Sequence, residues 1–170
     1  MTPWLWIALI SNLLYWAFFM RTVRRHRPGA AAVVVGVVHM LLAAFFSVAP
    51  IRSAIDPDYP GLGFGALRFE GQAAVLPSAL VLVWALASAY LVLTRRSGRS
   101  LWWVAAFDLA MAANLAAGIL AGGGGNDIQF GEHLTITGLT AMAIMLLLFV
   151  LGPVLSGLWS ARRALRPAAG

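Results

Sequence analysis

Two ionisable side chains lie deep inside apolar stretches of this chain, and they are the strongest candidates for chemistry. Asp108 is the only acidic residue within an apolar run, and His39 stands in the middle of another. An aspartate and a histidine in contact could hold and pass a proton, because imidazole changes its protonation state near neutral pH. A charged group at the centre of a membrane helix costs roughly 2.5–3.5 kcal/mol, so such a residue is expected to face the bundle and to have a partner.

Asn12 is a third polar side chain at a comparable depth. At a rise of 1.5 Å per residue, Asp108, His39 and Asn12 lie about 10, 15 and 12 Å from the expected cytoplasmic ends of their apolar stretches. We therefore expect one polar layer, with His39 as the partner of Asp108. This layer is either a site for a proton or a small polar solute, or a set of interhelical bonds worth about 0.6 kcal/mol each.

Five apolar segments must position these residues. A helix needs roughly 20 apolar residues to cross the hydrocarbon core of a membrane. The segments that meet this length cover about residues 2–20, 29–51, 73–94, 101–121 and 135–159. We predict an all-α fold in which residues 1–170 form a single domain, a bundle of five transmembrane helices.

The charged residues outside the apolar segments alternate in sign along the chain. Arginine clusters follow the first, third and fifth segments, and the other acidic residues lie in the alternate gaps. The clusters are Arg21, Arg24, Arg25 and Arg27; Arg95, Arg96 and Arg99; and Arg162, Arg163 and Arg166. Because positive charge marks the cytoplasmic side, we expect the N-terminus outside, the C-terminus in the cytoplasm, and the chain in a cell membrane, a bacterial inner membrane.

The composition excludes several classes of protein. The chain is 61% hydrophobic and 11% charged, whereas a soluble domain is about 25% charged, so the lipid bilayer is the expected partner. The net charge of +6 comes mainly from the arginine clusters beside the membrane, so we expect no nucleic-acid partner. Without cysteine, thiolate metal sites, disulfides and cysteine nucleophiles are excluded.

A second group of polar residues falls in the outer connections. It comprises Arg68, Glu70, Asp127, Glu132 and His133. These side chains could converge at the outer mouth of the bundle, which would suit a membrane enzyme or a quinone-reactive protein. Three ligands are needed for a catalytic zinc site, and adjacent helical residues point in different directions. We therefore assign no metal site, no catalytic residue and no particular cofactor.

Small residues recur at every fourth position of the fourth segment, at Ala106, Ala110, Asn114 and Gly118. Small residues let two helix backbones approach closely, so this stripe predicts a helix-packing seam. The short cytoplasmic turns predict that helices 1 and 2 form one hairpin and helices 3 and 4 another. Gly152-Pro153 should kink the fifth helix, because proline removes a backbone hydrogen bond.

We thus expect a non-enzymatic membrane subunit or small carrier that uses the polar layer. Five helices form a small bundle for a complete carrier, so a homo-oligomer or partner membrane subunits are expected. Two alternatives stay open: the outer-face enzyme, and a structural accessory subunit that has no site at all.

Overall fold

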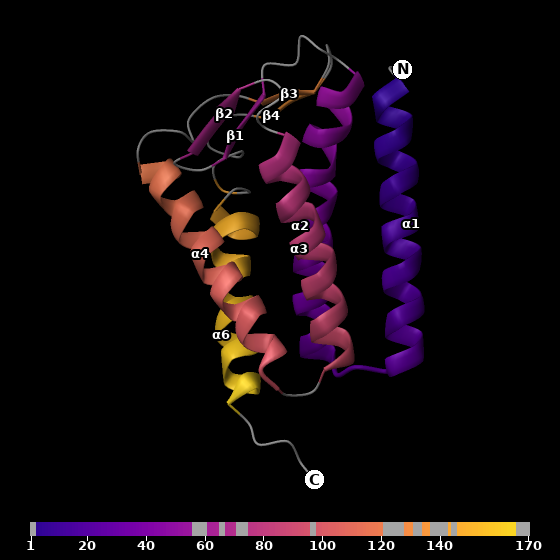
Figure 1. Ribbon diagram of the computed structural model, residues 1–170, viewed down its shortest axis with the longest axis vertical. Coiled ribbons are helices and arrows are strands. Elements are labelled where there is room, and N and C mark those ends of the chain that lie inside the picture. The colour runs from indigo at the N-terminus through magenta and orange to yellow at the C-terminus, as the bar shows by residue number, and fades with distance from the viewer. Residues whose placement is uncertain are drawn as a thin grey trace.

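Long helices dominate the computed structural model of this chain, which describes residues 3–55, 61–64, 67–70, 75–95, 98–120, 128–130, 134–136, 143 and 146–165. The helices are α1 (Pro3–His26), α2 (Ala30–Ile55), α3 (Val75–Thr94), α4 (Ser100–Leu120) and α6 (Gly152–Ala164), with the π-helical segment η2 (Leu146–Leu151) directly before α6 (Figure 1). Within these described residues, the four helices α1 to α4 are long and apolar enough to cross a membrane.

The first helix continues beyond its apolar stretch, through the arginine cluster to His26. Arginine is a good helix former, so a polar extension of the helix is favourable once it leaves the membrane. The helix ends at Arg27, which has a φ of 44° and donates its backbone N–H to the Val23 carbonyl at 2.9 Å. Such a left-handed residue commonly closes a helix, and the following Pro28 cannot continue it.

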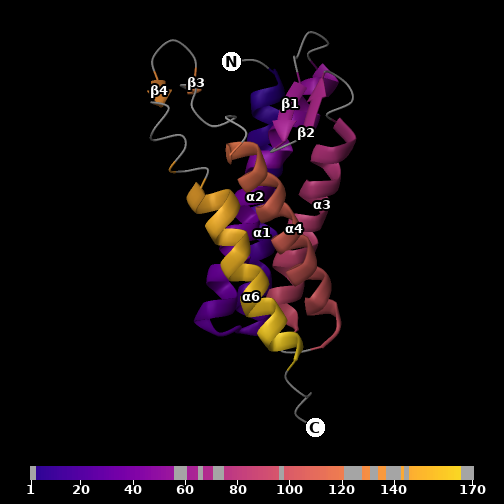
Figure 2. The same ribbon diagram turned by 90° about the vertical axis from the view of Figure 1, so that its left-hand side faces the viewer.

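The most extensive packing joins α2 with α3 and α4 with α6 (Figures 1 and 2). The predicted hairpins of helices 1 and 2 and of helices 3 and 4 are therefore not the closest pairs, and α3 and α4 make few contacts. A short turn brings two helix ends together but does not force the helices to pack along their length. Complementary small-residue faces do, as where Ala43 of α2 and Ala85 of α3 are fully buried.

The buried apolar residues form two clusters, one near the short turns and one near the opposite end. The first contains Phe19, Val35, Met40, Ala89, Val92, Leu93, Leu101 and Val104. The second contains Leu42, Ala43, Phe46, Val81, Ala85, Met111, Leu115 and Phe149. On α4, Asp108 falls between Val104 of the first cluster and Met111 of the second, while on α2 His39 lies beside Met40 at the end of the first cluster.

The described residues are almost entirely helical, as predicted, and two short β-hairpins are the exception. Strand β1 (Gly61–Phe64) pairs antiparallel with β2 (Leu67–Glu70), and β3 (Ile128–Phe130) pairs with β4 (Leu134–Ile136). In the first, Leu62 lies opposite Phe69 and Phe64 opposite Leu67. This alternation of apolar positions with glycine or charged ones has the period of a strand. The apolar residues of this hairpin are too few for a transmembrane pattern, so hydropathy predicts only a connection between two helices here.

The helical segment from Leu146 to Ala164 changes character at Gly152-Pro153, where η2 passes into α6. A π-helical turn is one way a chain accommodates a proline that cannot donate its backbone hydrogen bond. Glycines then bring α6 close to its neighbours. A Cβ at Gly157 would lie 3.0 Å from Leu109 Cγ and 3.2 Å from the Ala105 carbonyl oxygen of α4.

We predict that Gly157→Val destabilises the protein by about 1–3 kcal/mol, the usual cost of overpacking. The added carbons would meet the backbone of α4, which cannot move aside as a flexible side chain would. Thermal unfolding in detergent measures the effect. Ala113→Val, at an exposed position of α4, is the control and should unfold like wild type. Equal stability of the two variants would contradict a close α4–α6 contact.

Candidate functional site

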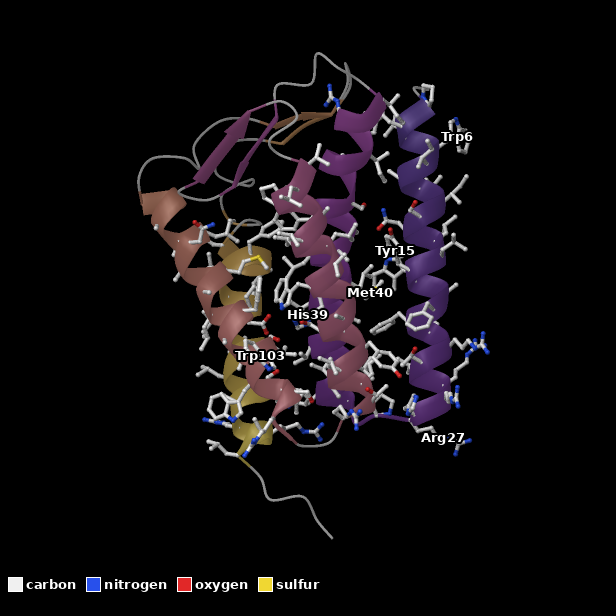
Figure 3. All side chains as sticks on the ribbon, viewed as in Figure 1. Trp6, Tyr15, Arg27, His39, Met40 and Trp103 are labelled. Atoms are coloured by element: carbon white, nitrogen blue, oxygen red, sulfur yellow. The ribbon has the colours of Figure 1, made fainter. Side chains whose placement is uncertain are left out.

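Asp108 holds α2, α4 and α6 together through both of its carboxylate oxygens. His39 Nε2 lies 3.1 Å from Asp108 Oδ1, and Ser156 of α6 donates its hydroxyl to Oδ2. The His39 and Asp108 side chains are 0% exposed, and Ser156 is also buried. Figure 3 shows His39 reaching from α2 into the space between the two helix pairs. The expected contact between His39 and Asp108 is present, and it crosses from one pair to the other.

The second ring nitrogen of His39 fixes how many protons the site holds. Nδ1 lies 2.9 Å from the Val35 carbonyl oxygen, which can only accept, so Nδ1 carries a proton. A bond between Nε2 and Asp108 Oδ1 then needs one further proton, on either atom. The pair is therefore an imidazolium with a carboxylate, or a neutral imidazole with a carboxylic acid. Both forms have no net charge, which suits a group enclosed between apolar clusters.

Aromatic rings close the side of the pair that faces α3. Trp84 meets the His39 ring edge to face, with ring centroids 5.5 Å apart, and stacks on Phe107 of α4 at 5.0 Å. The Trp84 indole nitrogen is buried and has no hydrogen-bond partner among the described residues. A buried donor without a partner costs free energy.

Comparisons with protein-family models, with curated proteins and with solved structures found no match.

Asn12 does not join this layer, and the predicted common depth is wrong. Its amide nitrogen donates to the Ala8 carbonyl at 2.8 Å and to the Ser47 hydroxyl of α2 at 3.0 Å. Ser47 lies eight residues beyond His39, about 12 Å further along α2. The reason is the length of α1: because the helix continues to His26, Asn12 is farther from the cytoplasmic end than its apolar stretch suggests. Asn12 ties α1 to α2 instead.

The outer-face residues are only partly within the described structure. Arg68 and Glu70 belong to β2, opposite Gly63 and Gly61 of β1. Asp127, Glu132 and His133 lie outside the described residues. Their convergence at an outer mouth therefore stays a prediction.

The small-residue stripe of α4 is not the face through which this helix packs in the chain. Ala106 and Ala110 are exposed and Asn114 is half-buried, while the surroundings of Gly118 lie outside the described part of the structure. The packed face runs through Leu101, Val104, Ala105, Asp108, Met111 and Leu115. Larger apolar residues and the Asp108 hydrogen bonds determine this choice. A contact through the stripe to another copy or subunit stays a prediction.

Sequence reasoning assigned neither Ser156 nor Trp84 to the site. Ser156, Gly157 and Ser160 form a group of small and polar residues within an apolar helix, and α6 buries them together with Pro153. That grouping was a usable signal, because hydroxyls within a membrane helix commonly bond across to a neighbouring helix. Trp84 lies well inside its apolar stretch, away from the interface where tryptophan is usually found. Its contact with His39 depends on the rotation of α3, which hydropathy does not report.

A double-mutant cycle can measure the contact between His39 and Asp108. We expect His39→Ala and Asp108→Ala to destabilise the protein individually and to show a coupling of about 0.5–3 kcal/mol when combined, because either single change leaves a buried polar partner. Unfolding free energies in detergent provide the four values. Asn12→Ala combined with Asp108→Ala is the control, and its two effects should add within about 0.5 kcal/mol. Coupling in the control but not in the first cycle would contradict the site described here.

Proposed function

We propose that this protein is a membrane subunit that binds and releases a proton at the His39–Asp108 pair. The observation that carries the proposal is an acidic and an imidazole side chain, both fully buried and directly bonded, on helices that are apolar enough to span a membrane. Ionisable residues inside membranes are costly, and they commonly mark proton or ion pathways.

The direct contacts favour a proton over a small polar solute. His39 bonds to one carboxylate oxygen and Ser156 to the other, so a solute would first have to displace one of them. A proton can bind without displacing either contact. Asp108 Oδ2 accepts a hydrogen bond from Ser156 and has a second lone pair, so it can take up a second proton while the first stays between Oδ1 and Nε2. The pair then changes from no net charge to +1.

A purely structural role is the competing interpretation. A buried polar pair is weak evidence for stability, since well-packed apolar residues often stabilise a protein as much or more. The two interpretations therefore differ in a measurable way. A purely structural hydrogen bond keeps the same protonation state at all accessible pH values, whereas a proton-binding site changes its protonation state.

Infrared difference spectroscopy on the reconstituted protein tests the proposal. We expect a carbonyl band of a protonated carboxylic acid to appear when the pH of the sample is lowered, because the added proton binds at Asp108 Oδ2. Asp108→Asn should abolish the band yet keep the fold, because the amide can donate to Nε2 of a neutral His39 and still accept from Ser156.

Glu70→Gln is the matched control for this measurement, since Glu70 lies in the β1–β2 hairpin and not in the polar layer. The band should persist in that variant. Loss of the band with Glu70→Gln and not with Asp108→Asn would show that the carboxyl group that takes up the proton is Glu70, at the outer face. Absence of any pH-dependent band from wild type would leave the structural role.

The orientation completes the proposal. We propose five crossings, with the segment of about 135–159 as the fifth, the N-terminus outside and the C-terminus in the cytoplasm of a cell. The arginine clusters support this topology. So does the continuation of η2 into α6, which ends beside Arg162 and Arg163. The exposed stripe of α4 is the proposed contact with another copy or with a partner membrane subunit.

Reporter fusions test the topology directly. Fusions after Arg27, Arg99 and Gly170 should report the cytoplasm, and a fusion after Gly61 should report the outside. A cytoplasmic signal at Gly61, or an outside signal at Gly170, would contradict the five-crossing arrangement.

A further inference from the structure

We propose that Ser160 is a proton relay between the His39–Asp108 pair and the cytoplasmic face, acting through water held at its hydroxyl. This inference rests on the proposed function, and it adds the route and the side of the membrane from which the proton is exchanged.

Ser160 is a fully buried hydroxyl that lacks a partner. It is 0% exposed, and its Oγ has no hydrogen-bond partner among the described residues. A buried hydroxyl without a partner costs free energy, and ordered water commonly satisfies such a group. The observation therefore points to a small polar ligand, water, within the interior of the bundle.

Ser160 lies beyond the contact between Ser156 and Asp108, toward the C-terminal end of α6. Ser160 lies one helical turn beyond Ser156 on α6, so the two hydroxyls share a face about 6 Å apart along the axis. That face is the buried one: Pro153, Ser156, Gly157 and Ser160 are the buried residues of α6. Ser156 already donates to Asp108. Ser160 in turn is about 6 Å from the end of the helix at Ala164, and it shortens the apolar distance to water.

Among the described residues, aromatic rings occupy the opposite direction. Phe149 of η2 lies seven residues before Ser156. Its ring packs against Phe45 and Phe46 of α2, with ring centroids 4.7 and 6.1 Å away. Phe46 and Phe149 belong to the apolar cluster on that side of the pair. The two buried hydroxyls of α6, those of Ser156 and Ser160, both lie between Pro153 and the C-terminal end of the helix. An exchange path along α6 therefore leads toward Arg162 and Arg163.

Few charged groups surround this path. On the elements packed against it, α2 contributes His39 and α4 contributes Asp108, while Arg99 precedes α4. On α6 the charged residues are Arg162 and Arg163, and the latter lies over the Trp159 ring at 4.5 Å. Helix α3 carries no acidic or basic residue between Val75 and Thr94. The hydroxyls are thus the polar groups available between Asp108 and the arginines at the helix end.

The transfer balances without any further reactant. Ser156 passes its hydroxyl proton to Asp108 Oδ2 and receives one from a water molecule, which receives one from Ser160. Ser160 is replenished by a water-borne proton from the cytoplasmic side. One proton enters, one oxygen–hydrogen bond is made at Oδ2, and every hydroxyl ends with the proton count it began with.

A single introduced cysteine tests water access, because the natural chain has none. Ser160→Cys is reconstituted in vesicles and exposed to a small membrane-impermeant thiosulfonate on either face. We expect modification from the face that carries Arg162 and none from the other. Ser88→Cys is the matched control, since Ser88 is equally buried but lies on α3, away from the α6 hydroxyls. It should stay unmodified. Equal resistance of both thiols, or modification of Ser160→Cys from the outer face alone, would overturn the inference.

A kinetic measurement separates this inference from the proposed function. After a pH jump on the cytoplasmic face, Ser160→Ala should slow the appearance of the Asp108 infrared band by about tenfold, the change expected when one ordinary hydrogen bond is lost from the chain. The final amplitude of the band should be unchanged, and Ser88→Ala should behave like wild type. A wild-type rate in Ser160→Ala would overturn the relay and leave the proton site intact. A missing band in wild type would overturn the proposed function itself.

Discussion

The bond between His39 and Asp108 is the interaction on which the arrangement of the helices depends. The chain packs as two helix pairs, α2 with α3 and α4 with α6, and there are few contacts between neighbouring α3 and α4. Across this sparse junction, His39 contributes from one pair while Asp108 and Ser156 contribute from the other. Because these groups are fully buried, the hydrogen bonds are strong and an unpaired partner would be costly. The junction is therefore held by these polar contacts together with the two apolar clusters, each of which joins residues of α2 and α3 to residues of α4.

The proton count of this bond is determined by the backbone. The Val35 carbonyl holds the proton of Nδ1, so Nε2 and Oδ1 must share one more if they are to bond. Removing that proton would place a lone pair of the imidazole against a carboxylate and weaken the junction between the helix pairs. Adding a proton at Oδ2 would alter the bond to Ser156, which lies within the α4–α6 pair. Loss and gain of a proton thus act on different contacts, one between the pairs and one inside a pair.

The sequence predicted the four longest helices and the contact between His39 and Asp108, and physical reasons explain what it left out. Hydropathy reports which residues leave water, but a helix that extends into polar solvent, as α1 does to His26, has no hydropathic signal. That extension moved Asn12 away from the expected layer and onto Ser47. Which face of a helix packs depends on its neighbours, so the small stripe at Ala106 and Ala110 looked like a seam and is exposed. The pairing of α2 with α3 likewise follows from complementary surfaces rather than from the length of a turn.

Small residues explain why a polar pair can exist at all in so short a chain. Gly157 brings α6 against Ala105 and Leu109 of α4, and this approach places the hydroxyl of Ser156 on Asp108. A larger residue at that position would separate the helices and leave one carboxylate oxygen buried without a donor, which costs far more than the packing it would gain. Gly152 performs a similar role beside Val38 of α2, where a Cβ would lie 3.1 Å from the valine. The glycines of α6 therefore determine whether the carboxylate of Asp108 is fully hydrogen-bonded, because they set the distance between α6 and its neighbouring helices.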